Sequence, residues 1–236
     1  MATVQQPAGS VAVPAEIATG SSAQTAPRTW IERNHFWLRR LHSLTGIVPI
    51  GGFIIYHFWE NATALLNPAA YDEMAGHARN LQLLIFIEIG LIFLPLLYHA
   101  LYGLFIASYS RYNTTNYSYT RNRLFMWQRI SGIILVLFIT YHVLVLRFGA
   151  FADRPATFAD MVGHLRNPFI FAFYVAGILS VSYHLGNGLW AFLITWGVTV
   201  GKRAQRISQW VTTAVAVALG LVGVSIITAI ALSSVQ

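Results

Sequence analysis

The dipeptide Tyr-His occurs four times in this 236-residue chain, each time inside a long apolar run. The copies are Tyr56-His57, Tyr98-His99, Tyr141-His142 and Tyr183-His184, with successive histidines 42, 43 and 42 residues apart. An ionisable side chain at membrane depth is costly and marks a candidate functional site. Neutral imidazole is a common metal ligand, and a six-coordinate b-type haem takes two. Four histidines therefore predict two haem b groups; the alternative is an unliganded proton relay.

The composition places these histidines in a membrane protein. Hydrophobic residues make up 56% of the chain and charged residues 10%, whereas a soluble domain carries about 25% charged residues. Mean hydropathy is +0.57. Cysteine is absent from the sequence, which excludes disulfides and thiolate-bound iron–sulfur clusters within the chain. The net charge of +7 comes from short segments between apolar runs, which indicates topology signals and no nucleic-acid binding.

Five apolar segments are long enough to cross a bilayer core, which needs about 20 helical residues. We expect spans over residues 41–66, 81–107, 125–146, 168–200 and 211–232. None of these runs alternates with a period of two, so strands are not expected. The predicted fold class is an all-α integral membrane bundle. Residues 1–34 form a polar N-terminal tail, and residues 35–236 form the five-helix domain.

Basic residues predict the direction of the spans. An excess of Lys and Arg marks the cytoplasmic side of a membrane protein. Four basic residues lie on one side of the predicted spans, and eleven lie on the side of the N-terminus. We therefore expect a multi-pass cell-membrane protein whose N-terminus is in the cytoplasm and whose C-terminus is outside. The eleven are Arg28, Arg33, Arg39, Arg40, Arg111, Arg121, Arg123, Arg129, Lys202, Arg203 and Arg206.

Alternating span directions sort the histidines into two couples. The first and third spans run outward, and His57 and His142 fall past their midpoints, in the outer half of the membrane. The second and fourth spans run inward, which puts His99 and His184 in the inner half. We therefore expect His57 and His142 to bind the iron of an outer haem, and His99 and His184 that of an inner haem.

Residues around the histidines are candidate haem contacts. Gly103 and Gly188 each lie four residues after a histidine on the same helical face. A missing side chain there would let the flat ring of a haem approach the backbone. The alternative is that these glycines only allow helices to pack closely. Donors to the propionates of the inner haem, or to its quinone-facing edge, are expected at the cytoplasmic ends of the first and third spans. The alternative is that Arg40 and Arg129 extend their charged groups to the membrane surface and act only as topology signals. These candidates are Arg40, His42, Ser43, Arg129 and Ser131.

Glu88 lies inside the second predicted span, eleven residues before His99 and therefore on about the same helical face. A carboxylate there is a candidate to pass protons to or from a quinone beside the outer haem. A structural hydrogen bond to a neighbouring helix is the alternative. His35, His77 and His164 are expected at water interfaces and receive no role.

Four motifs carry a resemblance to a known family: RRLHSL at 39–44, LPLLYH at 94–99, QRISGI at 128–133 and NGLW at 187–190. Their order, spacing and flanks resemble the cytochrome b subunit of succinate:quinone oxidoreductase, in its single-subunit type with five helices and two haems. The resemblance runs from about Arg33 into the fifth span. It implies the same couples, His57 with His142 at the outer haem and His99 with His184 at the inner haem.

The resemblance also implies partners and a reaction. The subunit would anchor a flavoprotein and an iron–sulfur subunit of respiratory complex II on the cytoplasmic side. Electrons would pass through the inner and then the outer haem to a quinone, typically menaquinone, in a succinate dehydrogenase of the tricarboxylic acid cycle. The chain itself would not act on succinate, because it has no dinucleotide fingerprint. The sequence leaves open the direction (fumarate reduction included), the haem potentials, the quinone type and a trimer of the whole complex.

The sequence is also compatible with two rival functions. One is a diheme anchor of another quinone-linked oxidoreductase, of the hydrogenase or formate dehydrogenase type, which co-purifying subunits would reveal. The other is a transporter that uses its histidines for proton coupling, which would be a colourless protein.

Overall fold

The computed structural model describes residues 29–80, 82–110 and 117–234, and within them it contains helices and no strand. The chain divides into two compact units, residues 1–36 and 37–236. The predicted tail, 1–34, lies outside the described residues except for its last six. The elements are α1 (Trp30–Ile47), α2 (Pro49–Ala62), η2 (Thr63–Leu65), α3 (Pro68–Arg79), α4 (Leu84–Ile87), η3 (Glu88–Phe93), α5 (Leu94–Tyr109), α6 (Thr120–Leu146), α7 (Phe158–Leu165), α8 (Pro168–Thr195) and α9 (Lys202–Leu232).

Five helical segments of the described chain are long and apolar enough to cross a membrane, which confirms the predicted number. They are Trp30–Leu65, Leu84–Tyr109, Thr120–Leu146, Pro168–Thr195 and Lys202–Leu232. The fourth helix ends five residues earlier than predicted, in a turn where Gly197 and Gly201 adopt positive φ. The fifth begins nine residues earlier than predicted, because the helix continues through a polar, basic turn that hydropathy does not detect.

Two spans contain local irregularities at prolines. The first span divides into α1 and α2 at Pro49, because proline cannot donate the helical hydrogen bond and its ring crowds the preceding turn. In the second span, the backbone widens to a π-helix over Glu88–Phe93, which ends two residues before Pro95. Such π segments are rare and often mark functional sites.

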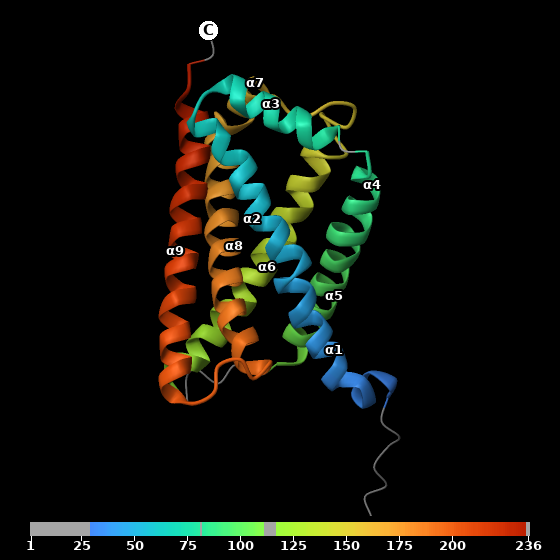
Figure 1. The fold of residues 1–236 in the computed structure, drawn as a ribbon, viewed down its shortest axis with the longest axis vertical. Helices are drawn as coiled ribbons and strands as arrows, with labels where there is room; N and C mark the ends of the chain where they lie inside the picture. The colour runs from blue at the N-terminus through green and yellow to red at the C-terminus, as the bar shows by residue number, and fades with distance from the viewer. Residues whose placement is uncertain (1–28, 81, 111–116, 235–236) are drawn as a thin grey trace, which may run out of the picture. The chain divides into compact units, whose positions relative to one another are not determined.

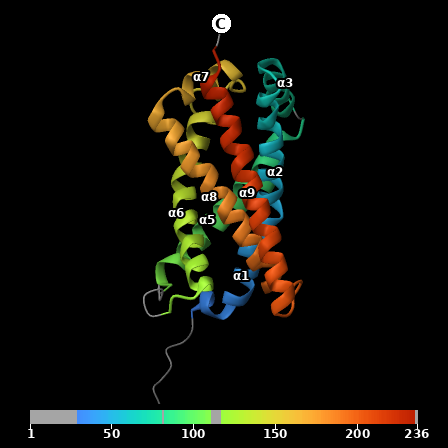
Figure 2. The same cartoon turned by 90° about the vertical axis from the view of Figure 1, so that its left-hand side faces the viewer.

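Within the second unit, α8 packs along both α6 and α9, as the two views of the ribbon show (Figures 1 and 2). The α2 and α5 helices complete the bundle in Figure 1. The short helices α3 and α7 lie together across one end, which we call the capped end. The opposite end holds the turn between α8 and α9 and the start of α6, and we call it the basic end.

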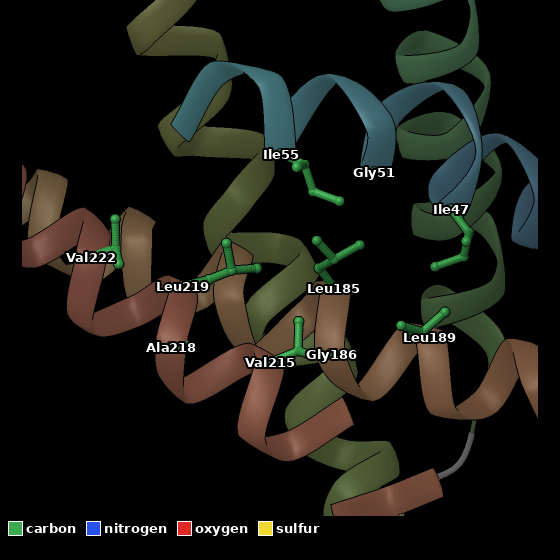
Figure 3. A pocket seen from close by; sticks show the side chains of 10 residues that line it. All are labelled: Ile47, Gly51, Ile55, Leu185, Gly186, Leu189, Val215, Ala218, Leu219 and Val222. Atoms are coloured by element: carbon green, nitrogen blue, oxygen red, sulfur yellow. The ribbon is translucent and has the colours of Figure 1, made fainter. Parts of the chain in front are cut away.

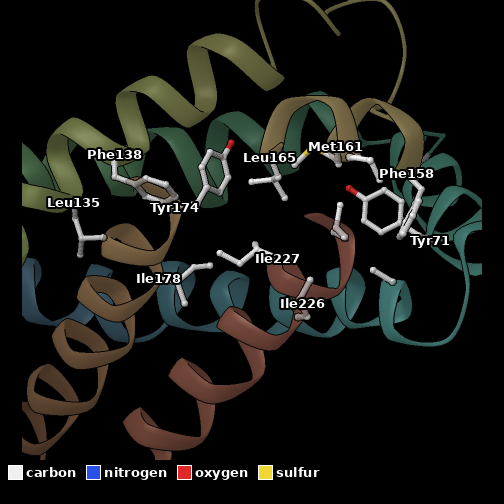
Figure 4. Packing of buried hydrophobic residues seen from close by; sticks show 13 residues of the cluster. Tyr71, Leu135, Phe138, Phe158, Met161, Leu165, Tyr174, Ile178, Ile226 and Ile227 are labelled. Carbon is white, nitrogen blue, oxygen red and sulfur yellow. The ribbon is translucent and has the colours of Figure 1, made fainter. Parts of the chain in front are cut away.

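The tightest packing lies toward the capped end, where α7 packs against α9 and α8 (Figure 4). Val162, Leu165 and Ile230 are each only 1% exposed. Most other large apolar side chains along the spans are exposed, which a bilayer tolerates because lipid replaces water around them. The α7 helix therefore anchors the capped end, and His142 adjoins this core through Phe138 and Tyr174.

Candidate functional site

The structure brings the four histidines of the Tyr-His dipeptides together in two couples. His57 on α2 faces His142 on α6, with ring centroids 5.8 Å apart and ring planes at 82°. His99 on α5 faces His184 on α8, with centroids 6.1 Å apart and planes at 80°. These are the couples that span direction predicts.

The spacing within each couple suits a metal ion held between two rings. Two imidazoles on opposite sides of one ion, each bound through nitrogen at about 2 Å, have centroids roughly 6 Å apart. No group of three or more His, Cys, Asp or Glu side chains in the described residues is placed to bind a metal. Two histidines alone suit an iron whose other ligands come from a porphyrin.

The inner couple is oriented by backbone carbonyl groups of neighbouring helices. His99 Nδ1 donates to the carbonyl oxygen of His42 at 2.9 Å, and the Tyr98 hydroxyl donates to the carbonyl oxygen of Leu38 at 2.8 Å. One turn further along α1, Gly46 faces the His99 ring so closely that an added Cβ would lie 2.4 Å from its Cε1. Leu38, His42 and Gly46 therefore form one stripe of α1 that holds this dipeptide.

The same stripe recurs on α6. His184 Nδ1 donates to the carbonyl oxygen of Gln128 at 3.1 Å, and the Tyr183 hydroxyl donates to that of Leu124 at 3.0 Å. A Cβ added to Gly132 would lie 3.2 Å from His184 Cε1. Two carbonyl acceptors and a glycine, four residues apart each time, thus position both histidines of the inner couple.

Side chains contact the Nδ1 atoms of the outer couple. His142 Nδ1 lies 3.3 Å from the Tyr174 hydroxyl, and His57 Nδ1 lies 3.4 Å from Asn61 Nδ2 and 3.7 Å from Glu60 Oε2. Within the described chain, the Nε2 atoms of all four histidines make no hydrogen bond. In a histidine that ligates a metal, one ring nitrogen binds the metal and the other generally donates a hydrogen bond to a neighbouring group. Here Nδ1 is the hydrogen-bonded nitrogen, so Nε2 is the one available to a metal.

The glycines predicted to admit a haem face contact other side chains. A Cβ added to Gly103 would lie 3.1 Å from His42 Cε1, and one added to Gly188 would lie 3.4 Å from Gln128 Nε2. Gly46 and Gly132 lie next to the rings of the inner couple. They belong to helices other than those of the histidines they approach, so spacing along one helix does not identify them.

The polar candidates at the basic end divide by their contacts. The His42 ring stacks on His99 at 4.0 Å, and its Nδ1 is buried without a hydrogen-bond partner in the described residues. Ser131 Oγ lies 3.1 Å from His184 Nδ1, so both residues adjoin the inner couple. Arg129 donates to Ser110 Oγ at 2.8 Å, and Arg40 lies over the Trp196 ring at 4.8 Å. Ser43 follows His42 on α1.

Glu88 forms a bidentate ion pair with Arg147, a partner that sequence reasoning missed. Arg147 Nε and Nη2 lie 2.8 and 2.9 Å from the two carboxylate oxygens, and both side chains are largely covered. The hydrogen bonds that Arg147 donates to the Glu88 carboxylate raise the pKa of Arg147 above its usual value. The pair joins the start of the π segment to the end of α6, at the half of the bundle that holds the outer couple.

His164 on α7 is a second residue that sequence reasoning missed. Its ring stacks on Tyr141 at 6.1 Å and meets Tyr174 edge-on at 5.6 Å, and Tyr174 in turn contacts His142. Its Nε2 is buried without a partner in the described residues, and burial lowers its pKa. A hydropathy pattern cannot predict this, because the position follows from α7 folding back over the bundle.

Fold and site together define a class: multi-pass helical membrane proteins in which intramembrane histidines face each other in couples. Residues 113–223 match the family described as succinate dehydrogenase/fumarate reductase transmembrane subunit. The chain is also 43% identical over 192 residues to the succinate dehydrogenase cytochrome b558 subunit of Bacillus subtilis, which covers 81% of this chain and 95% of that protein.

The chain therefore belongs to the family of succinate dehydrogenase cytochrome b subunits. It is a multi-pass cell-membrane subunit of succinate dehydrogenase, an oxidoreductase complex. Neither match favours an anchor of the hydrogenase or formate dehydrogenase type, or a transporter.

Proposed function

We propose that this chain anchors a flavoprotein and an iron–sulfur subunit to the membrane and conducts their electrons through two b haems to a quinone, with menaquinone the expected type. The observation that supports this most directly is the pair of facing-imidazole couples, with centroids 5.8 and 6.1 Å apart. Two couples on four helices correspond to two haems. Membership of the succinate dehydrogenase family supports the attachment of a flavoprotein and an iron–sulfur subunit.

His57 and His142 would hold the outer haem iron, and His99 and His184 the inner one. Each haem supplies a one-electron carrier when bound. The chain's own contribution is orientation: the carbonyl oxygens of His42 and Gln128 engage Nδ1 of His99 and His184 and leave Nε2 of each ring available to a metal. Hydrogen bonds of this kind also raise the basicity of the ligating nitrogen.

The basic end is proposed to face the cytoplasm, where the soluble subunits bind. The excess of Lys and Arg at this end supports that orientation. His99 lies ten residues before the end of α5 and His184 eleven before the end of α8, so their couple is the one nearer the basic end. Electrons from the iron–sulfur subunit would therefore reach this couple first.

The quinone is proposed to react near the outer couple, with Glu88 as a proton carrier. A covered carboxylate at membrane depth, next to a π segment, supports this role. The two hydrogen bonds from Arg147 hold the carboxylate in a fixed orientation.

Single alanine variants of the purified complex test the couples. His99→Ala and His184→Ala should each remove the same haem, and His57→Ala and His142→Ala the other, measured by haem content and a reduced-minus-oxidised spectrum. His77→Ala changes an exposed histidine outside the couples and is the matched control, expected to retain both haems. Two unchanged haems after His99 and His184 are both replaced would refute the assignment.

A further inference from the structure

The first turns of α9 form a basic hollow at the surface of the bundle. Lys202, Arg203, Arg206 and Ile207 line a space of about 610 Å³. The three cations are exposed and form no ion pair with an acidic side chain of the described residues. Because three uncompensated positive charges surround an open volume, an anion is the ligand that fits their charge.

An apolar groove lies further along the same helix, between α9, α8 and the first span (Figure 3). Its volume is about 470 Å³, and no polar side chain lines it. Gly51 and Gly186 are among the residues that line it, and Gly186 lies where α8 and α9 approach closely, since an added Cβ would lie 2.6 Å from Ala216 Cβ. The side chains that border it include Ile47, Ile55, Leu185, Leu189, Val215 and Val222.

The hollow and the groove lie on one face of α9. Ile207, Val211, Val215 and Val222 follow one another at intervals of four, four and seven residues, which keeps them on one stripe. All four are at least 40% exposed. The eight residues from Ile207 to Val215 correspond to about 12 Å along the helix. Trp210, 72% exposed, lies between the two features, where an interfacial aromatic is expected.

We propose that α9 binds one anionic glycerophospholipid, with its phosphate in the basic hollow and an acyl chain in the apolar groove. A phospholipid is the ligand class that joins a negative head to a hydrocarbon chain over this distance. A quinone is less suited to the groove, because its ring oxygens would find no hydrogen-bond donor there. An acidic protein surface could pair with the cations but could not fill a groove at membrane depth. The proposal does not depend on the haem ligands.

Native mass spectrometry of the delipidated whole complex tests the preference for an anionic head. Phosphatidylglycerol and phosphatidylcholine with identical acyl chains are the probes. We expect one phosphatidylglycerol per chain, bound at least about tenfold more tightly than phosphatidylcholine, because each basic side chain at a membrane surface favours an anionic lipid. Equal binding of the two lipids would overturn the proposal.

The variant Lys202→Gln/Arg203→Gln/Arg206→Gln should abolish this preference. The matched control, Arg33→Gln/Arg39→Gln/Arg123→Gln, removes the same charge elsewhere and should leave it intact. If the first variant loses the soluble subunits while its lipid preference stays, the hollow is a protein-docking site and the proposal is wrong.

Photocrosslinking of the unmodified complex provides a test that does not depend on a folded variant. A phosphatidylglycerol with a photoreactive group in the acyl chain should label α9 between Val211 and Val222, together with Leu185 or Leu189 on α8. The larger side chain of Ala218→Phe should reduce that labelling. Labelling confined to other helices would show that the groove is not the acyl-chain site.

Discussion

At the scale of single residues, the critical feature is which imidazole nitrogen remains available. A carbonyl oxygen can only accept a hydrogen bond, so the contacts of His99 and His184 with carbonyl groups require the proton on Nδ1. In the neutral imidazole, Nε2 is then unprotonated and able to bind a metal. The same contacts hold each ring in place, so a small steric change beside a ring should alter the site.

Gly46→Ala should displace the His99 ring, because the added Cβ would lie 2.4 Å from its Cε1. We expect a shifted midpoint potential or partial loss of one haem, and an unchanged second haem, in a redox titration followed at the α band. Gly52→Ala adds the same methyl group six residues later, where no atom lies within 4 Å, and should leave both haems unchanged. Identical titrations for both variants would contradict the close packing at Gly46.

At the scale of elements, α7 depends on its first turn. Thr157 and Asp160 form a capping box, in which each side chain accepts a hydrogen bond from the other residue's backbone N–H. Arg154 also donates to the Asp160 carboxylate. The hydrogen bond from Arg154, reinforced by those from Thr157, holds the pKa of Asp160 well below its usual range.

Asp160→Asn should therefore loosen α7 by about 1 kcal/mol, the typical contribution of a helix cap. A depressed carboxyl pKa stabilises the fold fully above the unfolded-state pKa of about 3.9 and progressively less as the pH falls toward the folded-state pKa. The difference between wild type and variant should be present at pH 7 and shrink below about pH 4. Hydrogen exchange of the α7 amides in detergent measures this difference in the stability of α7. A stability difference that does not change with pH would show that the Asp160 charge is not responsible.

The π segment is the second element with a testable role. Glu88→Gln keeps a side chain of the same shape beside Arg147 and removes the exchangeable carboxyl proton. We expect slower quinone reduction by the purified complex, with both haem spectra intact. The exchanged pair Glu88→Arg/Arg147→Glu restores the opposite charges in reversed positions. If the exchanged pair recovers full turnover, the ion pair is structural and Glu88 is not a proton carrier.

At the scale of the whole molecule, the spans have a direction that labelling can determine. The sequence contains no cysteine, so each introduced cysteine is the only target for a membrane-impermeant maleimide. Glu73→Cys, on α3 at the capped end, should react in intact cells if that end faces outward. Val200→Cys, in the turn at the basic end, should react only after permeabilisation. The reverse pattern would invert the proposed orientation and with it the assignment of inner and outer couples.

The sequence by itself determined the five spans, because each is a continuous apolar run whose length is a local property. It also determined the histidine couples: consecutive spans must alternate in direction, so depth along each span sorts the four residues. The ends of the fourth and fifth helices were less predictable. The fourth helix ends before the turn at Gly197 and Gly201 although apolar residues continue into it, and the fifth begins in a basic segment that is helical but not apolar.

Only the tertiary structure decided what surrounds the histidines. The carbonyl groups of Leu38 and His42, the close approach of Gly46 and the pairing of Glu88 with Arg147 all join residues about 50 to 60 positions apart. Such contacts depend on how each helix is rotated and how far it is shifted along its neighbour, and many sequences with the same apolar pattern allow several rotations. Side-chain packing between the helices selects one, and that selection places the polar groups around each imidazole.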